Sequence, residues 1–108
     1  MGRSSDVQAV VTQLWREHLA AEFPAALRGA ELAGIDLVLL DAGIAGCAST
    51  WRNAGGSLDA TRQRILRDCL RDLERVLPLL VEPDEVRYCQ RLRRLAVLTS
   101  GHGPKPTA

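Results

Sequence analysis

The sequence has few of the residues that usually mark a catalytic or metal-binding site. Its 108 residues include three cysteines and two histidines, and no two cysteines form a CxxC pair. HExxH, GxxxxGK[ST] and GxGxxG patterns are absent, as is a Ser-His-Asp set with plausible spacing. We therefore expect no cofactor, no metal ligands and no catalytic residues, and predict that the protein is not an enzyme.

Strong charge of either sign is also lacking. The net charge is +1, which provides no overall field for nucleic acid or a membrane. Residues 1–61 nevertheless carry −3 and residues 62–108 carry +4. The N-terminal Met1–Asp6 lacks the apolar run of a signal peptide. Three unpaired cysteines fit small buried side chains in a reducing compartment, so we expect a cytoplasmic, bacterial-type protein with no membrane partner.

The most apolar stretch, Ile35–Trp51, is central to the predicted fold. Its apolar residues recur at steps of three and four, Asp36 precedes them as a good helix N-cap, and Gly55-Gly56 follows as a stop signal. A strand at Leu37–Leu40 followed by a glycine-rich turn is the alternative. We favour a helix over about residues 36–53, buried on all sides, in which Gly43 and Gly46 allow neighbouring helices to approach closely.

One further helix is predicted before this central helix and two after it. Ser5 and Gln8 resemble a capping box, and Ser57 is a candidate cap for the third helix. Pro78 ends that helix, after which the apolar Leu79–Val81 is expected to tuck under the bundle. The predicted fold is an all-α, single-domain bundle of four main helices plus a short helical turn. The expected ranges are residues 5–22, 24–28 (the turn), 36–53, 58–77 and 83–100, with the domain covering 1–101 and a flexible tail covering 102–108.

Two groups of charged residues are candidate binding sites. Acidic clusters steer association with basic partners, and Glu17, Glu22 and Glu31, together with Arg28, form the protein-binding candidate. Arg87, Arg91 and Arg94 recur on one face of the last helix and form the anion or nucleic-acid candidate, and a solvated face is the alternative.

Asp41 is the one charge within the apolar stretch. As a buried polar residue it needs an arginine or a backbone N–H as partner, and a ligand or catalytic site built around it is a further alternative. His18, the only histidine before the tail, is expected to lie at the edge of an apolar stripe. Trp15 and Trp51 are expected in the core, with self-association as an alternative that would make a homodimer.

The segment from Phe23 to Leu95 also carries a resemblance. Its pattern FP…RG…GIDLVLLDAGIAGC…W…GGSLD, followed by spaced leucines, is similar to a group of small all-α bacterial proteins, some of them immunity proteins of polymorphic-toxin systems. The resembling residues are mostly core and turn positions. The resemblance implies a protein that binds and inhibits a partner protein, with no catalytic motif, while a nucleic-acid-associated regulator remains the alternative.

Overall fold

A computed structural model describes residues 3–100 of the chain, and these residues form a four-helix bundle. The long helices are α1 (Arg3–Ala20), α2 (Leu37–Asn53), α3 (Ala60–Val76) and α4 (Pro83–Thr99). Two short 3-10 turns, η1 (Ala25–Leu27) and η2 (Leu77–Leu79), and a small hairpin of β1 (Glu31–Leu32) and β2 (Ile35–Asp36) connect them. The predicted all-α bundle is therefore confirmed, with one more short turn than expected and a hairpin that was not foreseen.

The hairpin introduces α2. Its strands pair antiparallel with Glu31 opposite Asp36 and Leu32 opposite Ile35. The two linking residues, Ala33 and Gly34, both have positive φ angles of 54° and 77°, the backbone pattern of a tight two-residue hairpin. The hairpin sets the direction in which the chain enters α2.

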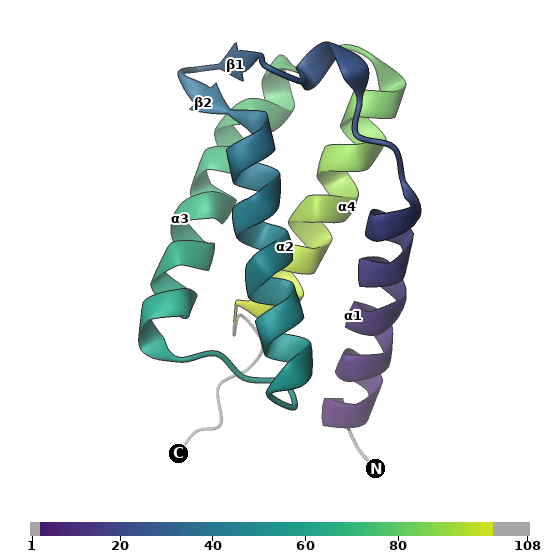
Figure 1. Cartoon of the computed structure of the whole chain (residues 1–108), viewed down its shortest axis with the longest axis vertical. Coiled ribbons are helices and arrows are strands. Elements are labelled where there is room, and N and C mark those ends of the chain that lie inside the picture. Colours follow the sequence, from purple (N-terminus) through teal and green to yellow (C-terminus); the bar gives the residue numbers. More distant parts are fainter. Residues whose placement is uncertain (1–2, 101–108) are drawn as a thin grey trace.

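α2 is a helix, so the strand alternative at Leu37–Leu40 is wrong. Asp36 is its N-cap, as predicted, and its carboxylate accepts from the backbone N–H groups of Val38 and Leu39 at 2.9 and 3.1 Å. α2 stands between α1 and α3 with α4 behind it, and it contacts all three (Figure 1). Six of its residues are buried in the common core: Leu37, Leu40, Ile44, Cys47, Ala48 and Trp51.

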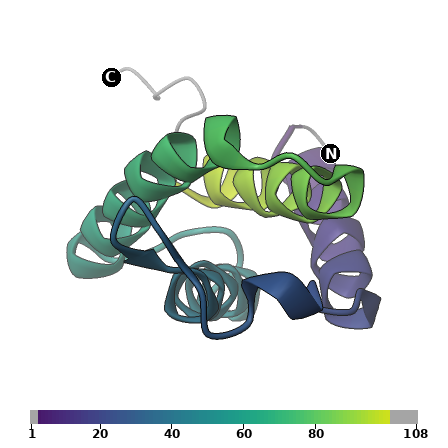
Figure 2. The ribbon, with the colours of Figure 1, turned by 90° about the horizontal axis from the view of Figure 1, so that it is seen from above.

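The prediction that α2 is buried on all sides is wrong for its outward face. In the view along the bundle, α2 lies at the edge of the molecule opposite α4 (Figure 2). Leu39 is 70% exposed, and Ala42 and Gly46 are exposed as well. A Cβ placed on Gly43 would lie 3.2 Å from the sulfur of Cys69, whereas one placed on Gly46 would meet nothing within 4 Å. The close approach expected at both glycines thus occurs only at Gly43.

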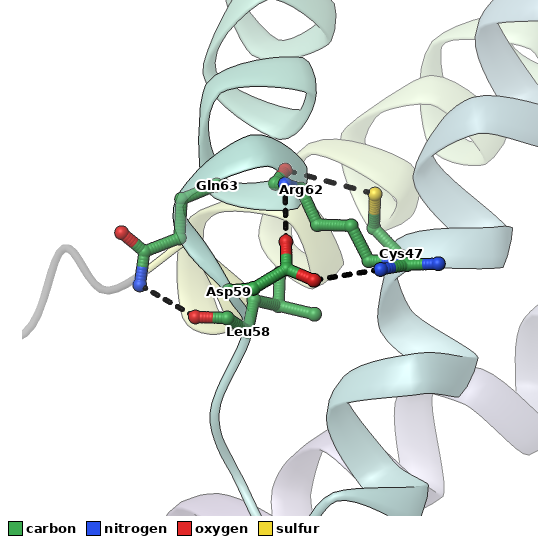
Figure 3. Close-up of polar contacts among 5 residues, drawn as sticks. All are labelled: Cys47, Leu58, Asp59, Arg62 and Gln63. Atoms are coloured by element: carbon green, nitrogen blue, oxygen red, sulfur yellow. Dashed lines mark hydrogen bonds and ion pairs between the residues drawn. The ribbon is translucent and has the colours of Figure 1, made fainter.

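The starts of α1 and α3 differ from the predicted ones. α1 already includes Ser5, so the proposed capping box is wrong, and the Gln8 side chain instead donates to the Gly55 carbonyl oxygen. α3 is capped by Asp59 rather than by Ser57: its carboxylate accepts from the Arg62 N–H at 2.8 Å (Figure 3). Asp59 takes this position because α3 begins at Ala60, two residues later than predicted.

The segment after α3 lies on the surface, contrary to prediction. Leu79 is 50% exposed and Val81 is 83% exposed, while Leu77 and Leu80 pack against the core. Leu77 and Leu80 are three residues apart, which is one turn of a 3-10 helix, so both reach the core while Leu79 stays exposed. The predicted tail at 102–108 lies outside the described residues.

Candidate functional site

A buried cluster of three polar side chains joins three helices. His18 of α1 contacts Asp41 of α2 through Nε2, which lies 2.6 Å from Oδ1. The phenol of Tyr88, on α4, donates to the other carboxylate oxygen, Oδ2, at 2.7 Å. His18 and Tyr88 are 5% and 6% exposed. The carboxylate of Asp41 is therefore satisfied on both oxygens by side chains from neighbouring helices.

Asp41 was predicted to be a buried polar residue; it is half-buried, and its partners differ from the expected ones. We expected an arginine or a backbone N–H, and the structure provides an imidazole and a phenol. His18 is buried rather than at the edge of a stripe. One signal in the sequence could have suggested these partners. Asp41 is the one charge in an apolar segment, and His18 and Tyr88 are polar side chains that also need a hydrogen-bond partner when they are buried.

The chemistry of the cluster is that of a fixed network. Because Nε2 of His18 faces the carboxylate, it carries the proton that is donated to Asp41. Nδ1 is buried and has no partner among the described residues. Burial, followed by the hydrogen bond to Asp41, raises the pKa of Tyr88 well above its usual value, so the phenol stays protonated as a donor. Neither of the two surface pockets described below is lined by Asp41.

Aromatic contacts extend the cluster towards the end of the bundle. The ring of Phe23 meets that of Tyr88 edge-on, with centroids 5.4 Å apart. Arg28 lies over the Phe23 ring at 5.4 Å, and Arg91 lies over the Tyr88 ring at 5.6 Å. These contacts anchor the connection between α1 and α2 onto the start of α4.

An acidic pocket opens beside Phe23, between the end of α1 and the start of α4. Its volume is about 440 Å³. Four carboxylates line it, from Glu22 on one side and from Glu82, Asp84 and Glu85 on the other, and Phe23 and Pro24 contribute apolar surface. We call this feature the acidic pocket.

The predicted acidic candidates do not form one surface. Glu22 lines the acidic pocket, and Arg28 lies next to it through its contact with Phe23. Glu17 accepts a hydrogen bond from Gln13 and lines a separate groove of about 330 Å³ between α1 and α4. Glu31 is exposed on β1. The sequence analysis assigned the other three carboxylates, Glu82, Asp84 and Glu85, only to a helix start. Their place in the pocket was missed because the two sides of the pocket are about sixty residues apart in the sequence.

The predicted arginine ridge is not a uniform row of free cations. Arg87 pairs with Asp84, beside the acidic pocket. Arg91 is half-buried against Tyr88, and its Nε is buried without a partner in the described part of the chain. Arg94 is exposed and lines the second groove together with Glu17. Because Arg87 is paired and Arg91 is half-buried, the three arginines do not present three equivalent free cations to solvent.

The three cysteines are free thiols within the bundle, Cys47 and Cys89 buried and Cys69 half-buried. Burial raises the pKa of each thiol, that of Cys89 to about 11. Within residues 3–100, no group of three or more His, Cys, Asp or Glu side chains is arranged to hold a metal ion. Over the same described range, no helix has the length and hydropathy needed to cross a membrane.

Comparisons with known proteins gave no match to any family model, curated protein or solved structure.

Proposed function

We propose that this protein is a non-enzymatic interaction module that binds a basic partner protein at the acidic pocket, in the way an immunity protein binds and inhibits its toxin. The observation that carries the proposal is the combination of four carboxylates and apolar surface in one concave site. The resemblance in Phe23–Leu95 to small immunity proteins supports the same class of function.

The charge at the pocket favours a cationic partner surface. Asp84 is paired with Arg87, whereas Glu22, Glu82 and Glu85 form no ion pair with another described side chain. Like charges held close together repel one another, and a lysine or arginine from a partner would relieve that repulsion. This electrostatic complementarity would speed association and make it sensitive to salt.

The neighbouring surface supplies apolar contacts. Val81 directly precedes Glu82 and is 83% exposed, and Leu79 on the same segment is 50% exposed. Protein interfaces commonly combine buried apolar anchors with a polar rim, and exposed apolar residues that gather together mark such interfaces. The end of the bundle therefore combines an acidic pocket with adjacent apolar side chains.

The buried cluster supports an interaction role better than catalysis. Each oxygen of Asp41 accepts a hydrogen bond, one from Tyr88 and one from His18, and Asp41 lines neither of the two described pockets. A general base must reach the proton that it abstracts. In this arrangement Asp41 connects helices and holds the Phe23 side of the pocket in place.

The test is a capture experiment with purified protein and lysate of the native host, at low and high salt. We expect one stoichiometric protein partner that is basic and is released by high salt. The double variant Glu22→Lys/Glu85→Lys should lose it, while the matched control Asp68→Lys, an exposed reversal on α3, should retain it. Val81→Ser, which removes the apolar side chain and adds no charge, should weaken capture without changing the salt dependence.

Two outcomes would contradict the proposal. If the pocket reversals leave every captured protein bound, the acidic pocket is not the binding surface. If nucleic acid is recovered instead, and Arg91→Glu abolishes that recovery, the alternative of a nucleic-acid-associated regulator is supported.

A further inference from the structure

The solvent side of α3 carries a row of four exposed arginines, Arg64, Arg67, Arg71 and Arg75. Because they are spaced by three, four and four residues, they lie within about 80° of one another around the helix axis. They point away from the side of α3 that is buried in the bundle. α3 itself stands at an edge of the bundle in both views (Figure 1, Figure 2). We call these four residues the α3 arginine row.

Carboxylates neutralise little of this row. Asp68 and Asp72 lie three or four residues from its members, the spacing at which side chains on a helix can pair. Only Arg71 does so, with Asp68 at 3.4 Å, and the other three arginines form no ion pair with another side chain of residues 3–100. Glu74 pairs at 3.0 Å with Arg93 of α4 instead. Three guanidinium groups of the row are therefore free to bind an anion from outside the chain.

Repulsion within the row is a second indication of an external anion. Arg67 and Arg71 are one helical turn apart, and so are Arg71 and Arg75. Like charges at this spacing destabilise a helix by about as much as an opposite pair stabilises it. The row thus opposes the stability of its own helix, and no contact within residues 3–100 requires it. Such a concentration of one charge attracts ligands of the opposite sign.

We infer that the α3 arginine row binds the phosphate backbone of a double-stranded nucleic acid. The row extends over about 16 Å of helix axis, at about 1.5 Å per residue. One strand of a duplex carries about five phosphates over that length, because successive phosphates follow at about 3.4 Å along the axis. A guanidinium binds phosphate oxygens through two parallel N–H bonds, which favours arginine over lysine at such sites. Four arginines therefore face a comparable number of phosphates.

Other anionic partners fit the row less well. Proteins bind single-stranded nucleic acid by stacking its bases on aromatic side chains, and the row contains none. A helix that lies on a membrane buries its apolar face in the lipid. The apolar face of α3 is buried within the bundle instead, where Leu66 and Leu73 are fully covered. Because backbone contacts carry no sequence information, we expect binding without preference for base sequence.

This inference does not rest on the proposed partner binding. The acidic pocket is lined by residues 22–26, 82, 84 and 85, none of which belongs to α3. The row is also distinct from the arginines of α4 that the sequence analysis selected. Variants of the row therefore leave both of those surfaces unchanged, and the two proposals can fail separately.

The test is the fluorescence anisotropy of a labelled DNA duplex of about 20 bp, titrated with the protein between about 50 and 200 mM salt. Four phosphate contacts predict that the logarithm of the affinity falls with the logarithm of the salt concentration with a slope of about −3.6, which weakens binding about 150-fold across this range. We expect a micromolar Kd at the lowest salt. An RNA duplex is titrated in parallel, and binding of either duplex with a slope near this value supports the inference.

Variants of the row locate the contact. Arg67→Gln should reduce the slope by about 0.9, and Arg67→Gln/Arg75→Gln by about 1.8, because each lost contact releases fewer counterions. Asp68→Asn should tighten binding, a gain that no folding defect can imitate. The matched control Arg16→Gln, at an exposed position on α1, changes the net charge as Arg67→Gln does and should leave the slope unchanged.

Glutamine has nearly the helix propensity of arginine, so each variant should fold, which circular dichroism checks. The inference is overturned if neither duplex binds at the lowest salt with up to about 100 µM protein. It is also overturned if the double variant keeps the wild-type slope, or if Arg16→Gln lowers the slope as much as Arg67→Gln does. Binding to vesicles of anionic phospholipid without binding to either duplex would assign the row to a membrane surface instead.

Discussion

Removal of one hydroxyl, in Tyr88→Phe, tests whether the buried cluster stabilises the fold as its geometry indicates. The change keeps the ring and its edge-on contact with Phe23, and removes the bond to Asp41 Oδ2 at 2.7 Å together with a longer contact to His18 Nε2 at 3.4 Å. Buried hydrogen bonds to charged groups contribute about 1.5 to 3 kcal/mol, roughly twice a neutral bond. Tyr88 is 6% exposed, so water replaces the lost donor poorly. We expect a loss near 2 kcal/mol.

Urea unfolding followed by circular dichroism measures this loss. With a slope of about 1 to 1.5 kcal/mol per molar urea for a domain of this size, the midpoint should fall by about 1 to 2 M. The matched control is Thr99→Val. Thr99 is 1% exposed, and its hydroxyl donates to the Leu95 carbonyl oxygen at 2.8 Å, so a neutral buried bond is removed at nearly constant shape. That variant should lose only about 1 kcal/mol.

A double-mutant cycle isolates the contribution of the Asp41 charge. In an Asp41→Asn background the phenol meets a neutral amide, so Tyr88→Phe should cost about 1 kcal/mol instead of about 2. Equal costs in both backgrounds would show that the charge does not strengthen the bond. A cost below about 0.5 kcal/mol in the wild type would refute the reasoning altogether, because the hydroxyl would then be replaced without loss.

Three further predictions concern single positions. Gly46→Ala should raise the free energy of unfolding by about 0.5 to 1 kcal/mol in dilute solution. Gly43→Ala should lower the free energy of unfolding, because the new Cβ would lie 3.2 Å from the Cys69 sulfur. Adding Cys69→Ala to that variant should relieve the loss. Asp36→Ala should lower the free energy of unfolding by about 1 kcal/mol, because it removes the side chain that caps two backbone N–H groups of α2. Thermal melting measures the effects of the glycine variants and of this one. Burial raises the pKa of Cys89 from 9.0 to about 11 in the folded state, so the thiol of the unfolded chain loses its proton first as the pH rises. The free energy of unfolding should therefore be highest below pH 9 and fall by roughly 2 to 3 kcal/mol as the pH rises to 11. Urea titrations across that range should show a smaller decline in Cys89→Ala, where the raised pKa values of Cys47, Cys69 and Tyr88 still contribute, and an unchanged decline would contradict the assignment.

The helices were predictable because their signals are local. In α2 the apolar spacing, the cap at Asp36 and the glycines after Asn53 lie within one continuous segment, and each agrees with the same boundaries. The caps of the other helices were less predictable. Ser57 and Asp59 are both good capping residues, and the choice depends on where the backbone after Gly56 first meets the bundle.

The buried cluster and the acidic pocket could not be predicted in the same way. His18, Asp41 and Tyr88 are separated by 23 and 47 positions, and their meeting depends on the axial register of α1 and α4 against α2. That register follows from side-chain packing along the whole length of each helix. The sequence therefore indicates that Asp41 needs a partner, but the partner is set by the packed structure.

Phe23 connects the buried cluster to the proposed binding surface. It lines the acidic pocket on one side and packs edge-on against Tyr88 on the other, while Tyr88 is held by Asp41. The polar network thus fixes the pocket wall without contributing a group to it. Because Tyr88→Phe retains the ring, it should lower stability yet leave partner binding intact, whereas Phe23→Ala should weaken binding because the pocket loses its apolar wall. Such a separation of stability from binding is expected when buried polar residues position a surface rather than act at it.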